Sequence, residues 1–199
     1  MEEIRVLGLA TSPREKGNTA ILLDAALEGA RNEGARVERI DAAQIKINPC
    51  LACNACFKEG KCVQNDDMQK LYPFLESYEY IIIAAPIFSM GLCAQAKALI
   101  DRLQCFWARK YILKKRSTGR DTEKSRGLWI STAGSELERV FDGARPTISY
   151  FFAMLEIKKH ESLTFRGVDE AGAILSVPGA LEAARVLGAR QTREIIGAE

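Results

Sequence analysis

The sequence predicts an α/β fold in which a five-stranded parallel sheet is doubly wound, with helices on both faces. Two observations predict it. Short apolar runs alternate along the chain with segments whose apolar residues recur at helical spacing. Residues 80–85 form an apolar, isoleucine-rich run, which is typical of a central parallel strand that helices cover on both sides. In such a sheet the crossovers are right-handed and ligands bind at the carboxyl ends of the strands.

Local patterns predict the individual elements. Apolar runs predict strands at residues 4–10, 37–40, 80–85, 127–131 and 163–165. Helical periodicity predicts helices at residues 19–31, 94–103 and 181–196, and one within 140–155 despite Pro146. A helix running toward residue 77 is predicted because Asn65 and Asp66 can cap its start with short side-chain oxygens. Residues 41–65 show no clear period, so we expect a functional loop there.

Composition favours one globular domain spanning residues 1–199. The chain is 47% hydrophobic and 27% charged, so it can bury a full core. Its 28 basic and 26 acidic residues nearly balance, which gives no argument for a nucleic acid or an anionic membrane as partner. No stretch reaches the roughly 18 apolar residues of a membrane span, and Met1-Glu2-Glu3 does not resemble the start of a signal peptide. We therefore expect a cytoplasmic protein.

A loop rich in hydrogen-bond donors separates the first strand from the first helix. Residues 11–19 carry hydroxyl groups, backbone amides and a guanidinium beside a helix N-terminus, where an anion is stabilised. The loop lacks the glycine patterns of dinucleotide and Walker loops, which favours a single phosphate over a pyrophosphate. The alternative is that these residues only build a loop and a helix cap. The candidate phosphate-binding residues are Ser12, Arg14, Gly17, Asn18 and Thr19.

Two further loops at the same sheet edge can hold a flat heterocycle. Residues 86–91 offer backbone amides for the polar edge of an isoalloxazine ring, apolar contact from Phe88 and Met90, and close backbone approach at Gly91. Residues 131–135 end the next strand and offer a second contact. The alternatives are an ordinary turn with Phe88 and Met90 in the core, and a helix cap. The candidate residues are Pro86, Ile87, Phe88, Ser89, Met90, Gly91, Ala133 and Gly134.

Four of the six cysteines are clustered. Cys50, Cys53, Cys56 and Cys62 form the pattern C-x2-C-x2-C-x5-C. In a reducing cytoplasm such a group is more typical of metal ligands or redox thiols than of disulfides. Ferredoxins use the same C-x2-C-x2-C run to hold a cubane iron-sulfur cluster, whereas four-cysteine zinc sites usually join two separated C-x-x-C turns. The spacing favours a cluster, with zinc and free or redox thiols as the alternatives.

Other reactive residues are few. Cys93 and Cys105 lie in or beside a helical pattern and are predicted to pack in the core. His160 is the only histidine, which leaves little scope for His-based metal sites or for Ser-His and Cys-His pairs. Residues 109–126 contain eight basic residues and two acidic ones, and we interpret this basic segment as a solvated insertion.

Together these residues resemble the iron-sulfur flavoproteins, which belong to the NADPH-dependent FMN reductase group with a flavodoxin-like fold. The resemblance spans nearly the whole chain and rests on Ser12-Pro13-Arg14 through Gly17-Asn18-Thr19, the cysteine loop at residues 46–65, Asp66-Asp67-Met68 and Pro86-Ile87-Phe88. It implies FMN held by the three loops and a [4Fe-4S] cluster on Cys50, Cys53, Cys56 and Cys62. It also implies a homodimer or homotetramer, a ferredoxin-like electron donor, and electron transfer from cluster to FMN, often across a subunit interface.

These features predict an electron-transfer oxidoreductase that passes electrons between the cluster and FMN and reduces a small acceptor such as oxygen, peroxide or a quinone. No side chain is required as nucleophile or general base, because the cofactors carry the chemistry. One alternative is an NAD(P)H-dependent FMN or quinone reductase whose cysteine loop holds zinc or nothing. Another is a non-catalytic metal-binding interaction module. The basic segment could dock a partner of that module, attract an acidic redox protein or complete a neighbouring protomer's flavin site.

Overall fold

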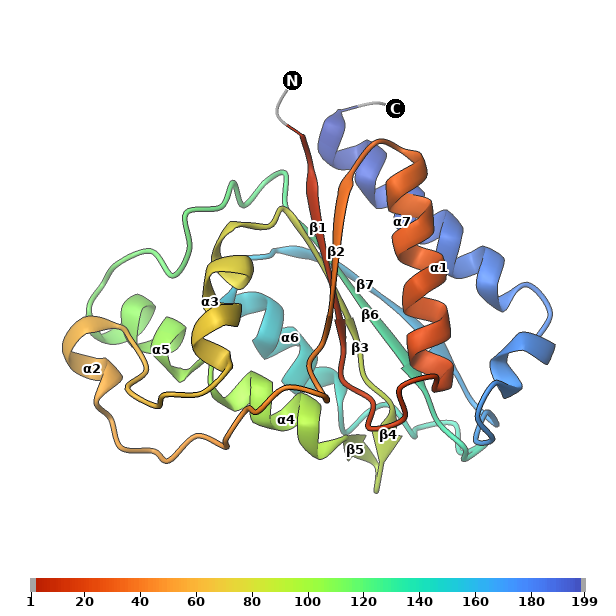
Figure 1. Ribbon diagram of the computed structural model, residues 1–199, viewed down its shortest axis with the longest axis horizontal. Helices are drawn as coiled ribbons and strands as arrows, with labels where there is room; N and C mark the ends of the chain where they lie inside the picture. Colours follow the sequence, from red (N-terminus) through yellow and green to blue (C-terminus); the bar gives the residue numbers. More distant parts are fainter. Residues whose placement is uncertain (1–2, 198–199) are drawn as a thin grey trace.

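The computed structural model describes residues 3–197, and a five-stranded parallel sheet lies at its centre (Figure 1). The strands are β1 (Arg5–Ala10), β2 (Arg36–Asp41), β3 (Tyr80–Ala84), β6 (Arg126–Thr132) and β7 (Lys159–Phe165). They pair in the order β2-β1-β3-β6-β7, with every pair parallel. The chain reverses its direction of winding between β1 and β3, which makes that edge the topological switch point. The predicted doubly wound sheet is confirmed; Met1 and Glu2 lie outside the described residues.

Helices cover both faces of the sheet, and each face has its own core. On one face lie α1 (Asn18–Asn32) and α7 (Ala180–Ile196), and on the other lie α3 (Met68–Ser77), α4 (Ala94–Asp101) and α6 (Arg145–Met154) (Figure 1). Side chains of β3 alternate between the two cores, with Ile82 in the α1 and α7 core and Ile81 and Ile83 in the other. This double burial explains why β3 is apolar throughout its length.

Several short elements were not predicted individually. They are the strands β4 (Ile87–Phe88) and β5 (Gly91–Leu92), the helices α2 (Cys56–Glu59) and α5 (Gln104–Trp107), the π-helical turn η1 (Ala108–Ile112) and the 3-10 turn η2 (Ala173–Ser176). The helix α2 lies in the cysteine loop and packs against α5 and η1, partly through a Phe57–Trp107 ring contact with centroids 5.8 Å apart. This contact places the cysteine loop beside α5.

Two boundaries differ from those that the sequence predicts. β7 begins at Lys159 and not at Leu163, because it is an edge strand whose first residues are polar or partly exposed. α6 begins at Arg145, so Pro146 lies in the first turn of the helix, where its missing N–H costs no hydrogen bond. Within residues 3–197, no helix has both the length and the apolar character needed to cross a membrane.

Candidate functional site

The loop predicted to bind phosphate forms a tight turn at the carboxyl end of β1. Ser12 Oγ accepts a hydrogen bond from the backbone N–H of Arg14 (3.1 Å), and the N–H of Gly17 donates to the Arg14 carbonyl (2.9 Å). A Cβ at Gly17 would lie 3.0 Å from that carbonyl oxygen and 3.1 Å from Ser12 Oγ, so a larger residue would crowd the turn. The turn delivers the chain directly into α1, which begins at Asn18.

The first turn of α1 is anchored to the loop that follows β7. Asn18 Nδ2 donates to the Glu170 carbonyl (2.9 Å), and Asn18 Oδ1 accepts from the N–H of Ile174 (3.3 Å). Arg14 donates from Nη1 to the Asp169 carbonyl (2.7 Å). The Asn18 side chain therefore holds two loops together. The first backbone N–H groups of α1 have no acceptor within the helix, so they can bind an anion.

A pocket of about 350 Å³ opens at this sheet edge and collects most of the predicted contacts. The predicted residues that line it are Ser12, Arg14, Gly17, Asn18, Thr19, Pro86, Ile87, Phe88 and Gly134. Ser89, Met90, Gly91 and Ala133 are predicted residues outside its lining. Three further residues line the pocket: Thr132, which lies in the predicted contact loop 131–135 but was not a named candidate, and Val168 and Asp169, which were not predicted. Thr132 ends β6, and the other two follow β7, so the rule that parallel strands end at one edge could have found all three.

The segment after β3 is a small hairpin. β4 pairs antiparallel with β5, with Phe88 opposite Gly91. At its tip Ser89 and Met90 have φ values of 49° and 66°, which non-glycine residues seldom adopt. Phe88 and Met90 are 45% and 46% exposed, so the alternative that they pack in the core is wrong. A Cβ at Gly91 would meet no atom closer than 4.0 Å, so packing within the chain does not require a glycine there.

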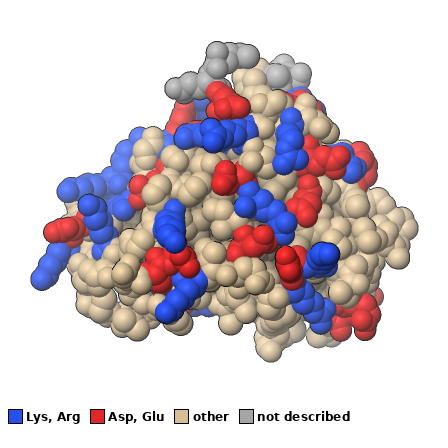
Figure 2. All heavy atoms as spheres, in the orientation of Figure 1, with Lys and Arg blue, Asp and Glu red and all other residues tan. Residues whose placement is uncertain are grey.

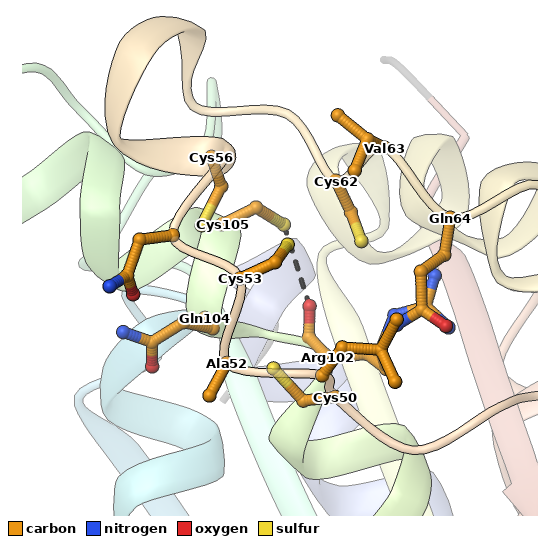
Figure 3. A pocket seen from close by; sticks show the side chains of 12 residues that line it. Cys50, Ala52, Cys53, Cys56, Cys62, Val63, Gln64, Arg102, Gln104 and Cys105 are labelled. Carbon is orange, nitrogen blue, oxygen red and sulfur yellow. Dashed lines mark hydrogen bonds between the residues drawn. The ribbon is translucent and has the colours of Figure 1, made fainter.

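The cysteine loop encloses a second pocket, of about 340 Å³, that is open to solvent. Cys50, Cys53, Cys56 and Cys62 all line it, together with Cys105 from α5. Figure 3 shows these side chains arranged around the space between the loop and α5. Cys105 is buried, as predicted for a core cysteine, but it is also part of this pocket. The loop therefore brings its four thiols to one place.

The thiols in this pocket influence one another's ionisation. Burial raises the pKa of Cys56, and the neighbouring Cys62, Cys50 and Cys53 raise it further. Burial also raises the pKa of Cys105 to about 11, with smaller contributions from Cys62 and Cys56. Thiolates that are gathered in a partly buried pocket repel one another, so a bound cationic metal centre would stabilise the thiolate form. The chemistry of these donors therefore fits a metal centre, although within residues 3–197 no three His, Cys, Asp or Glu side chains are grouped so that they could hold one metal ion.

Hydrogen bonds fix both ends of the cysteine loop to α3. Asp66 accepts from the backbone N–H groups of Asn48 (2.9 Å) and Met68 (3.2 Å). At the other end, Gln69 Nε2 donates to the Cys62 carbonyl (2.9 Å). The N-cap position of α3 is Asp67, one residue beyond the predicted Asn65 and Asp66, although the Asp66 carboxylate does accept from the N–H of the first helical residue.

The basic segment at residues 109–126 contributes to the fold, so its interpretation as a purely solvated insertion is wrong. Arg109 donates from Nε to the Gly60 carbonyl (2.8 Å) and from Nη1 to Glu76 (2.6 Å). Arg120 is buried and donates to two backbone carbonyls at 2.7 Å each. Burial lowers the pKa of Arg120 to about 10. These arginines meet carbonyl groups that would otherwise be unpaired in the interior.

Three consecutive cations of the segment, residues 114–116, are exposed, whereas Arg126 at its end is buried at the start of β6. Lys114, Lys115 and Arg116 have exposed side chains, and the bond from Arg109 to Gly60 holds the segment against the loop. Figure 2 shows Lys and Arg side chains gathered at the left edge of the molecule, in the region of α2 and of the chain after η1. The surface next to the cysteine pocket is therefore positively charged.

The fold and the pocket at its switch point define a flavodoxin-like α/β protein. The family model for NADPH-dependent FMN reductase matches residues 4–163, which include the phosphate loop, the cysteine loop and the hairpin. The match covers more than half of the chain, so the chain belongs to the NADPH-dependent FMN reductase family, as its sequence predicts.

Curated relatives of the chain are iron-sulfur flavoproteins. One from Archaeoglobus fulgidus is 39% identical over 100 residues, covering 50% of this chain and 46% of the relative. One from Methanocaldococcus jannaschii is 38% identical over 99 residues, covering 50% and 51%. One from Methanosarcina thermophila is 33% identical over 113 residues, covering 57% and 59%. The chain spans about half the length of the curated relatives it matches. These matches confirm the resemblance to that group.

Solved structures confirm the fold. An NAD(P)H:quinone oxidoreductase from Methanothermobacter marburgensis superposes with a TM-score of 0.74 at 15% identity, covering 95% of this chain and 96% of that one. An FMN-dependent NADH-azoreductase from Bacillus anthracis, in complex with FMN, superposes with a TM-score of 0.68 at 13% identity, covering 94% and 99%. At these identities the likeness concerns the fold alone.

Proposed function

We propose that this protein is an electron-transfer flavoprotein that passes electrons between a [4Fe-4S] cluster and FMN and reduces a small acceptor. The observation that carries the proposal is the pocket lined by Cys50, Cys53, Cys56 and Cys62 in a chain of the FMN reductase family. Four cysteine thiolates are the donor set of a cubane cluster, and the first three of these cysteines have the C-x2-C-x2-C spacing that ferredoxins use. The curated relatives are named iron-sulfur flavoproteins, which supports an iron-sulfur cofactor beside a flavin.

FMN would occupy the pocket at the switch point. Its phosphate would accept hydrogen bonds from the Ser12 hydroxyl, the Arg14 guanidinium and the first N–H groups of α1. Its ring would lie against residues 86–91, where Phe88 is exposed and can cover an apolar face. Thr132 and Gly134 line the rest of the pocket. The chain's own residues thus bind and orient the flavin, and none is required as an acid or a base.

The two cofactors divide the redox chemistry. When bound, the cluster exchanges single electrons and FMN exchanges one or two, so single-electron delivery can support two-electron reduction of oxygen, peroxide or a quinone. The exposed Lys114, Lys115 and Arg116 beside the cysteine loop favour an acidic, ferredoxin-like donor, because opposite charges steer such proteins together. Reduction of the bound flavin by NADPH without any donor protein would contradict this role and support an NAD(P)H-dependent reductase.

A homodimer or homotetramer is part of the proposal. Tyr111 in η1 and Tyr150 in α6 are both exposed, and they lie near each other, since Tyr111 contributes, after burial, to the raised pKa of Tyr150. Exposed aromatic side chains from adjacent elements are typical of association surfaces. Sedimentation velocity on the wild type and on Tyr150→Glu would test this: a wild-type monomer would contradict it.

The decisive experiment compares Cys53→Ala with the wild type after anaerobic purification. Visible spectra with iron, sulfide and zinc analysis should show flavin bands in both proteins and a broad iron-sulfide absorption only in the wild type. Cys93→Ala is the control for loss of a cysteine outside the cysteine pocket, and it should keep the iron-sulfide absorption. Flavin without iron in the wild type would exclude the cluster, and absence of both would favour a metal-binding interaction module.

The flavin site has its own test. Arg14→Ala removes a charged hydrogen-bond donor, an interaction that contributes about 1.5–3 kcal/mol, so the Kd for FMN should rise roughly 10-fold to 150-fold. Arg31→Ala is the control, because Arg31 is exposed in the last turn of the same helix. Equal FMN affinities of the two variants, measured by quenching of flavin fluorescence, would show that the phosphate does not bind at the β1–α1 loop.

A further inference from the structure

A buried ion pair lies beneath the cysteine pocket. The side chains of Arg102, which follows α4, and Asp66 are both 0% exposed, and they form a two-pronged contact of 2.6 and 3.0 Å. Arg102 Nη1 also donates to the Asn48 carbonyl (2.9 Å), two residues before Cys50. The Tyr72 hydroxyl donates to the Arg102 carbonyl (3.0 Å). The pair therefore ties α4 to the beginning of the cysteine loop.

One donor of this guanidinium has no partner. Arg102 Nε is buried and makes no hydrogen bond, although an N–H without an acceptor is unfavourable in a protein interior. Among residues 3–197 there are other buried polar atoms without partners, but only Arg102 also lines the cysteine pocket. Cys62 lies near enough to interact electrostatically with the same guanidinium. Figure 3 shows Arg102 beside Cys50 at the base of this pocket.

We propose that Arg102 donates its Nε–H to a sulfur of the cluster or of a ligating cysteine, and thereby raises the reduction potential of the cluster. The proposal rests on the proposed function. One-electron reduction by the ferredoxin-like donor adds a negative charge to the cluster, and the hydrogen bond strengthens as that charge grows. Arginine suits this position because its charge is permanent and its planar fork can bind Asp66 while Nε remains free for another acceptor. Asp66 acts as a positioning residue.

The test is the midpoint potential of the cluster in Arg102→Lys. Lysine keeps a positive charge near Asp66 but has a methylene group where arginine has Nε–H. The ratio of reduced to oxidised cluster at a given applied potential should fall about tenfold, which is 59 mV for a one-electron couple. Lys97→Gln is the matched control, because it removes an exposed cation from α4 that pairs with Asp101 outside the pocket. This control should leave the potential unchanged.

A second measurement does not depend on how well the variant folds. In wild-type protein labelled with 15N only at arginine, pulsed electron paramagnetic resonance of the reduced cluster should detect a coupled 15N nucleus. The coupling should persist in Lys97→Gln and disappear in Arg102→Lys. If the lysine variant loses its cluster, the measurement on the labelled wild type is sufficient to test the proposal. A coupled arginine nitrogen supports the proposal, and the absence of any such coupling overturns it.

Failure of the proposed role of Arg102 can be distinguished from failure of the proposed function. A wild type with full iron and sulfide but an unchanged potential in Arg102→Lys would overturn the role of Arg102 and leave the proposed function standing. A wild type that holds neither iron nor sulfide after anaerobic purification and reconstitution would overturn the proposed function, and the role of Arg102 with it.

Discussion

Replacing Gly60 with alanine tests how the cysteine loop is held in place. Gly60 ends α2 with φ of 73°, in the left-handed region that glycine adopts without strain. A Cβ at this position would collide with Cγ of Arg109. Arg109 in turn bonds the Gly60 carbonyl, Glu76 and the Ser117 carbonyl at 2.8, 2.6 and 3.0 Å. The substitution therefore strains the backbone and also displaces a side chain that links the loop to the basic segment.

The two effects can be estimated separately. Alanine in a left-handed conformation costs about 1 kcal/mol. Displacing Arg109 weakens hydrogen bonds that involve a charged group, which costs about 2 kcal/mol more. Gly34→Ala is the matched control, because Gly34 has φ of 84° but a Cβ there would have no neighbour within 4 Å. We expect a melting temperature lowered by roughly 6–12 °C in Gly60→Ala and by roughly 2–4 °C in Gly34→Ala.

Thermal unfolding followed by circular dichroism under anaerobic conditions measures both shifts, and iron analysis accompanies it. Cys62 lies two residues beyond Gly60, so Gly60→Ala should also hold less iron than the wild type, whereas Gly34→Ala should hold the same amount. Equal melting temperatures and equal iron contents of the two variants would refute the reasoning, because they would show that Arg109 does not hold the loop.

Three further predictions concern buried groups. Asp66→Ala leaves the Arg102 guanidinium buried without its partner, so the free energy of unfolding in urea should fall by about 3–5 kcal/mol; a fall below about 1 kcal/mol would contradict the buried pair. Burial lowers the pKa of His160, so its neutral form stabilises the fold above the unfolded pKa of about 6.5, and this stability is lost as the pH falls through the lower native pKa. The melting temperature should therefore fall between about pH 7 and about pH 5 in the wild type and less so in His160→Asn; parallel curves would exclude this titration. Leu99→Ala, in the buried face of α4, should cost about 2–5 kcal/mol and lower both flavin and iron content, and loss of only one cofactor would show that α4 does not serve both pockets.

The strongest sequence signals correspond to the most buried elements. The run at residues 80–85 and the apolar part of β1 predict the centre of the sheet, because full burial requires apolar residues at every position. The cysteine spacing likewise predicts which four thiols share a pocket, because the spacing is local. Polar edge strands give weaker signals, which is why the first residues of β7 were missed.

Charged residues show the limit of the sequence pattern. Arg109 and Arg120 belong to a run of basic residues that is indistinguishable from a solvated segment until the folded chain brings distant carbonyl groups to them. Val168 and Asp169 were missed for a related reason, since they line the pocket at the switch point only because of the position of β7 in the sheet. In both cases the contacting segments are far apart in the sequence, so local composition does not predict the contact.

The helix α4 connects the two pockets, and this connection fixes how far apart they lie. At its start, Cys93 Sγ donates to the Thr11 carbonyl (3.3 Å), immediately before the phosphate loop. At its end, Arg102 holds Asn48 and lines the cysteine pocket. Eight helical residues span about 12 Å, so the separation of these two anchors is set by a rigid element and not by loops. A cysteine loop alone could bind the proposed cluster in many orientations, but a loop tied to the end of α4 would hold it at a fixed position relative to the pocket at the switch point, where we propose that FMN binds.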